Sequence, residues 1–258
     1  MLCELRIPFT SERGLSYGWS SASVLHGILM QQIPTEDAAL LHEQGLRPFH
    51  QTVLRSGDAF EWIVSALDQN TGKMLLDPLR SLREVYSEQK DDTLHFGEPV
   101  ARQLSYDELF KQHYIRTEPS RLASLEFLSP TAFKSAGSYV NLPSPRLILS
   151  GLAKRYDMTC QTHETEYEGL LETISEQVEI SSYKLRSTNF SLEGVRIPAF
   201  MGTLTLRIGG NQTFRRYIHM LCDYAGFSGV GIKTALGMGH IRYTVPEFPA
   251  ERRDTRNG

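Results

Sequence analysis

The stretch Ala225-Gly-Phe-Ser-Gly-Val-Gly-Ile-Lys-Thr-Ala-Leu-Gly-Met-Gly-His-Ile-Arg-Tyr243 holds five glycines within fourteen residues. Glycine adopts positive φ freely and lets the backbone approach other groups closely, so this density indicates a sharply bent segment. Lys233 lies in its middle, among serine, threonine and backbone N–H groups. This composition is typical of a segment that presents N–H groups and a cation to phosphate. A tight turn between two elements is the alternative.

Two familiar glycine motifs fit this stretch poorly. A P-loop would place lysine directly after Gly231, but Ile232 intervenes before Lys233. A dinucleotide-binding fingerprint would need a glycine where Thr234 stands, and a βαβ unit after it. A nucleotide-binding enzyme that uses the loop as a phosphate cradle is therefore the weaker hypothesis.

The charges of the 258-residue chain are unevenly distributed, although the net charge is only −3. The region 156–183 has acids and no lysine or arginine, whereas 195–244 has six basic residues and one acid, Asp223. Such a concentration of basic residues is typical of a surface that binds a polyanion; a solvated basic face is the alternative. The three separate cysteines, the lack of a long apolar run and the absence of a signal-peptide pattern favour a cytoplasmic protein.

Hydrophobic periodicity predicts two successive β-α-β-β-α-β units, and hence an α+β protein with two tandem ferredoxin-like domains. We expect the domains at residues 1–118 and 119–245, with a flexible tail at 246–258. The first unit has predicted strands at 2–9, 49–55, 60–67 and within 94–104, and helices at 20–33, 36–44 and 71–82. The second has predicted strands at 122–127, 178–186, 199–208 and 240–245, and helices at 145–156 and 212–225, the latter capped by Asn211.

Four stretches of the chain resemble one family. The loop 226–239 resembles the C-terminal glycine-rich loop of the RAMP superfamily. The segment 25–29, and 39–43 followed by 47–49, resemble the N-terminal half of the CRISPR precursor-RNA processing endoribonucleases, the "Cas six" group, and 128–133 resembles the start of their second domain. The resemblance implies two ferredoxin-like domains that bind CRISPR repeat RNA, often a hairpin, and cut it once.

The implied chemistry needs no metal and no cofactor. A 2′-hydroxyl attacks the adjacent phosphorus and the 5′-oxygen leaves, which gives a 2′,3′-cyclic phosphate and a 5′-hydroxyl. The reaction needs a base, an acid and a cation near the phosphate, and histidine titrates near neutral pH. The histidines and acids of the chain show no zinc-ligand spacing.

The resemblance assigns the catalytic roles to the N-terminal half. His42 matches the family's histidine and is the expected general acid or base, with Arg47 as the phosphate clamp. A helix C-terminus raises the pKa of a histidine such as His42, and a helix-end capping contact is the alternative. Some relatives carry a tyrosine on the first helix where Met30 stands here, so His26 and the upstream Tyr17 are further candidates.

The candidates for RNA binding come mostly from the second half. Lys233, Arg215 and Arg216 are the expected phosphate contacts, and an exposed helix face is the alternative for the arginine pair. The remaining candidates are Gly229, Gly231, Thr234, Arg146, Tyr139, His50 and His240. A rival hypothesis is a RAMP-type subunit that holds repeat RNA in a CRISPR effector complex without cutting it.

Overall fold

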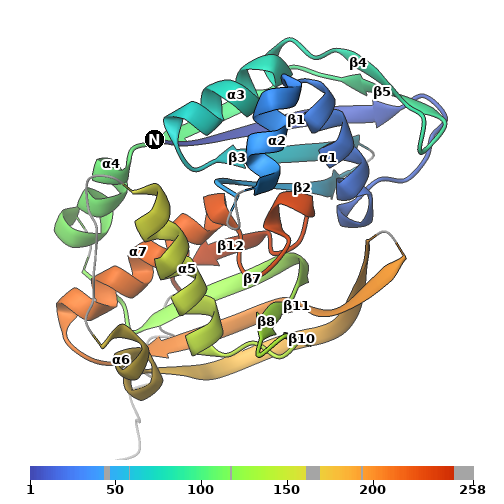
Figure 1. Ribbon diagram of the computed structural model, residues 1–258. Helices are drawn as coiled ribbons and strands as arrows, with labels where there is room; N and C mark the ends of the chain where they lie inside the picture. Colours follow the sequence, from blue (N-terminus) through green and yellow to red (C-terminus); the bar gives the residue numbers. More distant parts are fainter. Residues whose placement is uncertain (44–46, 58, 117, 161–168, 193, 247–258) are drawn as a thin grey trace, which may run out of the picture.

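The structure is a computed structural model that describes residues 1–43, 47–57, 59–116, 118–160, 169–192 and 194–246 (Figure 1). It is an α+β fold with two ferredoxin-like halves, as predicted. Within the described residues, no helix combines the length and the apolarity needed to cross a lipid bilayer.

The first sheet is built around β1 (Leu2–Ser11), which is antiparallel to its neighbours β3 (Ala59–Ala66) and β6 (Val100–Leu104). β2 (Phe49–Ser56) pairs with the other edge of β3, which gives the order β2-β3-β1-β6. This is the strand order expected of a ferredoxin-like unit, whose first strand lies between the third and the last.

One predicted strand in the first half is in fact two. The region 94–104 contains the end of β5 (Asp92–Phe96) and all of β6, and both pair with β1 at different positions. Pro99, between them, has no backbone N–H to donate to a ladder. β4 (Glu84–Ser87), which was not predicted, forms a hairpin with β5.

Three helices lie together on one side of the first sheet: α1 (Ala22–Gln31), α2 (Thr35–Glu43) and α3 (Gln69–Arg80) (Figure 1). α1 buries Val24, Leu25, Ile28 and Leu29, the apolar face that the sequence predicts. The side chain of Asp68 caps α3 by accepting a hydrogen bond from the backbone N–H of Thr71. The half ends with α4 (Tyr106–Lys111) and a π-helical turn at Gln112–Arg116.

The second sheet has the order β10-β11-β7-β12, again the ferredoxin-like order. Its strands are β7 (Leu122–Thr131), β10 (Val178–Leu192), β11 (Val195–Ile208) and β12 (Ile241–Thr244). α5 (Pro145–Thr159) and α7 (Gln212–Ser228) pack on one face, and Asn211 caps α7 as predicted. Elements that were not predicted are β8 (Phe133–Ser135), β9 (Ser138–Val140) and α6 (Leu170–Gln177).

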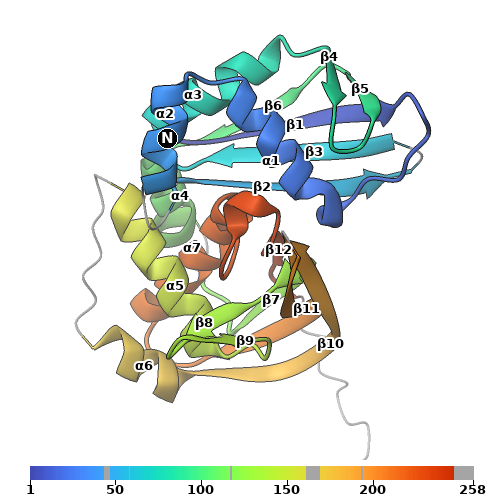
Figure 2. The ribbon, with the colours of Figure 1, turned by 45° about the vertical axis from the view of Figure 1, so that its right-hand side comes forward.

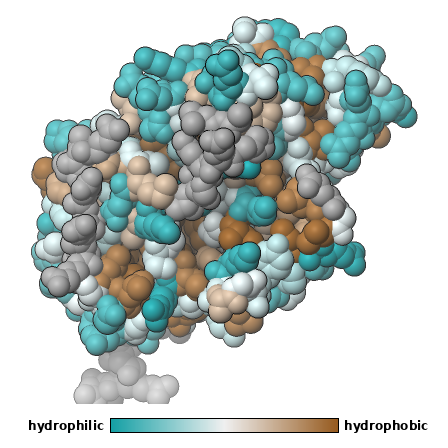
Figure 3. Space-filling view, viewed as in Figure 1, coloured by the Kyte–Doolittle hydropathy of each residue, from teal (hydrophilic) through white to brown (hydrophobic). Residues whose placement is uncertain are grey.

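The two halves share apolar cores. Leu2 and Leu67 of the first half belong to the core of the second half, while Ala235 of the glycine-rich stretch belongs to the core of the first. The tip of the β10–β11 hairpin also reaches the first half, where the rings of Phe190 and Trp19 lie 6.4 Å apart. Figure 3 shows apolar surface along the junction of the halves.

Candidate nucleic-acid interface

The glycine-rich stretch, residues 226–239, begins in the last turn of α7, continues toward β12 and lies between the two halves (Figure 2). Its central 3-10 turn, Thr234–Leu236, packs against β2. Gln51 Nε2 donates to the carbonyl oxygen of Ala235 at 3.0 Å, and Thr52 Oγ1 donates to that of Gly237 at 3.2 Å. The position of this loop is therefore fixed by the first half as well as by the second.

Gly229 and Gly231 allow close packing of the loop. Their φ angles are +66° and +84°, in the region that favours glycine. A Cβ on Gly231 would lie 2.3 Å from the carbonyl oxygen of Ala132, and one on Gly229 would lie 2.9 Å from Nδ1 of His50. These glycines were expected to contact RNA, but the structure shows that they contact other parts of the protein. Gly226 differs from both, because it lies inside α7.

Much of the loop's backbone is occupied by internal hydrogen bonds. The N–H of Val230 donates to Gly239 O at 2.8 Å, that of Ile232 to Ala132 O at 3.0 Å, and that of Gly239 to Pro130 O at 3.0 Å. The expectation that these N–H groups face phosphate is therefore wrong. They hold the loop to itself and to the segment after β7.

Lys233 is the exposed cation of the loop. Its own φ is +55°, a left-handed conformation that is uncommon outside glycine. The neighbouring Thr234 is only 4% exposed, so its expected contact with RNA does not fit the structure. Among the sequence-based candidates in the loop, the side chain of Lys233 is the one available to a phosphate.

His50 and His240 form a buried pair where the halves meet. His50 Nδ1 lies 2.9 Å from the carbonyl oxygen of Thr234, and its Nε2 lies 3.0 Å from His240 Nδ1. Because a carbonyl only accepts, His50 Nδ1 carries the hydrogen, and Nε2 of the neutral ring accepts from His240. Burial lowers the pKa of His50 to about 3 and lowers that of His240 as well. Both were expected to contact RNA, but their contacts are within the protein.

The other basic candidates are spread over the second half. Arg146 is exposed in the first turn of α5. Arg215 and Arg216 are half-buried near the start of α7, and Arg216 Nη1 donates to the carbonyl oxygen of Tyr114 at 2.9 Å. The rise of an α-helix places the arginine pair about 20 Å from the loop that follows α7. The structure thus does not bring them together with Lys233.

Two catalytic candidates lie near the beginning of β2. His26 on α1 is 8% exposed and stacks on Phe49, with ring centroids 6.1 Å apart. Ala22, one turn earlier on α1, packs closely on the loop: a Cβ added to Gly237 would lie 2.2 Å from the Cβ of Ala22. Arg47 is half-buried just before β2, and burial lowers its pKa. His26 and Arg47 therefore flank the strand on which the loop packs.

The other two catalytic candidates have different outcomes. The backbone of His42 lies in the last turn of α2, as predicted, while its side chain lies outside the described residues. Tyr17 is 3% exposed, and its hydroxyl donates to Asp92 Oδ2 at 2.8 Å inside the first core. Burial raises the pKa of Tyr17. This geometry does not support Tyr17 as a proton donor to a bound ligand.

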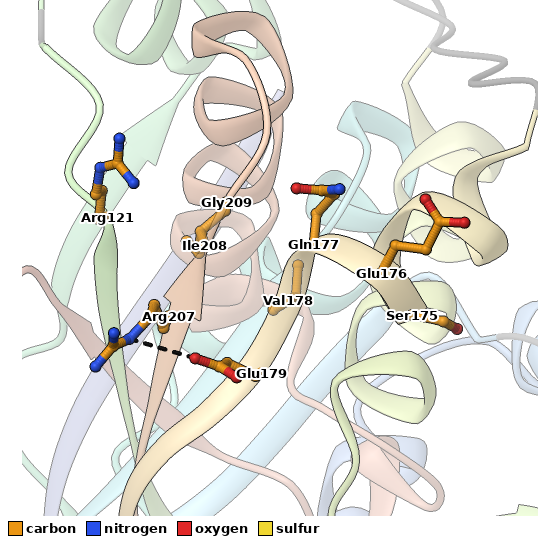
Figure 4. A pocket seen from close by; sticks show the side chains of 9 residues that line it. All are labelled: Arg121, Ser175, Glu176, Gln177, Val178, Glu179, Arg207, Ile208 and Gly209. Atoms are coloured by element: carbon orange, nitrogen blue, oxygen red, sulfur yellow. Dashed lines mark ion pairs between the residues drawn. The ribbon is translucent and has the colours of Figure 1, made fainter.

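A surface pocket of about 350 Å³ lies where α6 joins β10 (Figure 4). Arg207, part of the basic region, forms an ion pair with Glu179 at 3.4 Å there. Arg242 is likewise paired with Glu126, at 3.2 Å. Part of the positive charge is therefore neutralised locally. The pocket is lined by Arg121, Ser175, Glu176, Gln177, Val178, Glu179, Arg207, Ile208 and Gly209, and none of them was a site candidate.

Comparisons with known proteins agree on one family. A family model described as CRISPR-associated endoribonuclease Cas6 matches residues 125–241. The Cas6 endoribonuclease of Streptococcus thermophilus is 32% identical over 237 residues, which are 92% of this chain and 97% of that protein. That of Mycobacterium tuberculosis (strain CDC 1551 / Oshkosh) is 32% identical over 231 residues, 88% of this chain and 73% of that protein.

A solved structure of a Cas6 product complex has a similar fold. It superposes with a TM-score of 0.79 at 24% identity, covering 95% of this chain and 100% of its own. The sequence resemblance is thus confirmed over both halves. The chain belongs to the family of CRISPR-associated Cas6 endoribonucleases.

Proposed function

We propose that this protein binds CRISPR repeat RNA, folded as a hairpin, and cuts the precursor transcript without a metal ion. The 2′-oxygen next to the scissile bond forms a new bond to phosphorus, and the bond from phosphorus to the 5′-oxygen breaks. The 2′-hydroxyl proton goes to a base, and the leaving oxygen receives one from an acid. The products carry a 2′,3′-cyclic phosphate and a 5′-hydroxyl.

One observation carries this proposal beyond family membership. The loop that exposes Lys233 packs on β2 beside α1, and His26 and Arg47 flank the beginning of the same strand. A phosphate contact and the acid–base candidates thus belong to neighbouring elements. Proton transfer by a positioned side chain contributes about a hundred- to ten-thousand-fold, and a nearby cation stabilises the charge that develops on phosphate.

The proposed roles follow from the sequence match and from this arrangement. His42, at the end of α2, is the main general acid or base, and His26 is the second candidate. Arg47 is the phosphate clamp, because an arginine stays charged even where burial lowers its pKa. Lys233 and the exposed Arg146 contact the RNA backbone.

The experiment is a cleavage assay with the host's labelled repeat RNA in EDTA, followed by analysis of the product ends. We expect one cut, a cyclic phosphate end, and loss of cutting when the scissile nucleotide is 2′-deoxy. Cleavage that needs added metal, or that survives the 2′-deoxy substitution, would refute the mechanism. Tight binding without any cut would instead support a non-cleaving subunit of an effector complex.

A further inference from the structure

We infer that Arg155 of α5 is a positioning residue for the glycine-rich loop, and that it sets the affinity for RNA through Lys233. This inference rests on the proposed function. Arg155 is only 8% exposed, and within the described residues it has no ion pair with a carboxylate. A buried guanidinium requires other acceptors, because burying its N–H groups unsatisfied is costly.

The acceptors of Arg155 are backbone carbonyls at the start of the loop. Its Nη1 donates to the carbonyl oxygens of Ser228 at 2.5 Å and Gly229 at 3.3 Å, and its Nη2 lies 3.4 Å from that of Gly231. The last carbonyls of a helix have no partner within the helix. Arg155 thus caps α7 from the neighbouring helix and ties down the segment two residues before Lys233.

The charge of Arg155 matters as well as its hydrogen bonds. The C-terminus of a helix carries a partial negative charge of roughly half an electron, which would repel a phosphate bound at Lys233. Arg155 is a buried cation at this end of α7, so it offsets that charge. The positive charge of Arg155 also acts at the contact between the loop and β2. Burial is the main cause of the lowered pKa of His50 on β2, and the charge of Arg155 lowers this pKa further.

The rest of the loop is held by other contacts. Ile232 N–H donates to Ala132 O, and the carbonyl oxygen of Thr234 accepts from His50. Loss of the Arg155 side chain therefore frees the segment 228–231 while these anchors remain. We expect the main consequence in RNA binding, with a smaller one in the chemical step.

The test compares three single variants, Arg155→Met, Arg155→Lys and Lys233→Ala, with two double variants. Each double variant combines Lys233→Ala with one of the two Arg155 changes. Dissociation constants for the labelled repeat RNA are measured at several salt concentrations, and the cleavage rate constant is measured at saturating protein. Lys154→Met is the matched control, because it removes a cation from the exposed side of the same helix. Wild-type protein must bind and cut the RNA; if it does not, the proposed function fails first.

We expect Arg155→Met and Lys233→Ala each to weaken binding about tenfold and to lower the salt slope by about one. The dissociation constant of the double variant Arg155→Met/Lys233→Ala should be at most about twofold higher than that of Lys233→Ala. The cleavage rate constant of each variant at saturating protein should stay within about twofold of the wild-type value. Arg155→Lys keeps the charge but cannot span the carbonyls, so it should bind about threefold more weakly than wild type. If Arg155→Met does not fold, Arg155→Lys provides the test of the hydrogen bonds to the loop.

Three results would overturn the inference. The first is wild-type affinity and salt slope in Arg155→Lys or Arg155→Met while Lys233→Ala weakens binding. The second is full additivity of the Arg155 and Lys233 effects, which would mean that the residues act independently. The third is a loss of affinity in Lys154→Met equal to that in Arg155→Met, which would mean that any cation on α5 has the same effect on RNA binding. An unchanged affinity in Lys233→Ala would instead remove the phosphate contact from the proposed function.

Discussion

The buried pair His50 and His240 makes the stability of the protein depend on pH. Both rings are neutral in the folded protein, because burial holds their pKa values below 6.5, that of His50 at about 3. In the unfolded chain both regain a pKa of about 6.5. The unfolded state then binds more protons below that pH, so the free energy of unfolding falls as the pH falls from 7 toward the folded pKa values.

The size of the effect follows from proton linkage. Between pH 7.5 and pH 5.5, each histidine that stays neutral in the folded state removes about 1.4 kcal/mol from the free energy of unfolding. Since both members of the pair are fully buried, we expect about 3 kcal/mol for the two together. This is a large share of the roughly 5–15 kcal/mol by which natural domains are stable.

The assay is urea denaturation of wild type and of the double variant His50→Asn/His240→Asn at pH 7.5, 6.5 and 5.5. Tryptophan fluorescence reports on the junction, because Trp62 Nε1 donates to Gln51, which holds the loop, at 2.7 Å, and Trp19 lies against Phe190 of the second half. Subtracting the variant removes the contribution of the other histidines. Wild type should lose about 3 kcal/mol more than the variant over this range. Equal losses in the two proteins would refute the account of the pair.

Two further expectations concern single positions. Gly231→Ala should lower the free energy of unfolding by about 1–3 kcal/mol or more, because its φ is +84° and its Cβ would lie 2.3 Å from a carbonyl oxygen. The control is Gly226→Ala, at a helical position where a Cβ would meet open space; it should be neutral or stabilise the protein by up to about 1 kcal/mol. Similar urea midpoints for Gly231→Ala and Gly226→Ala would contradict this expectation. Tyr17→Phe should cost about 1.5–3 kcal/mol through the lost hydrogen bond to Asp92 and leave cleavage unchanged, whereas Tyr86→Phe, at an exposed pair, should cost little. A stable Tyr17→Phe protein that cuts slowly would show that Tyr17 takes part in catalysis.

The repeating fold was predictable because its signals are local. The alternation of Thr203 to Ile208 predicted β11, and in the structure Leu204, Leu206 and Ile208 are buried while Arg207 is exposed. The apolar spacing of α1 and the Asn211 cap of α7 are equally local. The short strands β4, β8 and β9 were missed because three or four residues carry too little periodicity.

The candidate site was less predictable because its contacts are long-range. Nothing near His50 in sequence shows that it pairs with His240, a partner 190 residues away. The sequence also could not distinguish a glycine loop that presents its N–H groups to a ligand from one in which many of them, such as those of Val230, Ile232 and Gly239, bond internally. Arg155 was overlooked because two adjacent basic residues on a helix, Lys154 and Arg155, suggest an exposed face. The sequence signal was the position of Arg155 next to the apolar residues Leu152 and Tyr156 of the same helix, both of which are buried in the structure.

The central claim is a division of labour between an RNA-holding loop and a cutting site on the first half. The most direct measurement is single-turnover cleavage of the repeat RNA by His42→Ala and Lys233→Ala across a range of protein concentrations. We expect His42→Ala to slow cutting about a hundredfold or more at saturation with nearly unchanged affinity, and Lys233→Ala to weaken binding with a nearly unchanged saturating rate. The reverse pattern, or full activity in His42→Ala, would contradict the account.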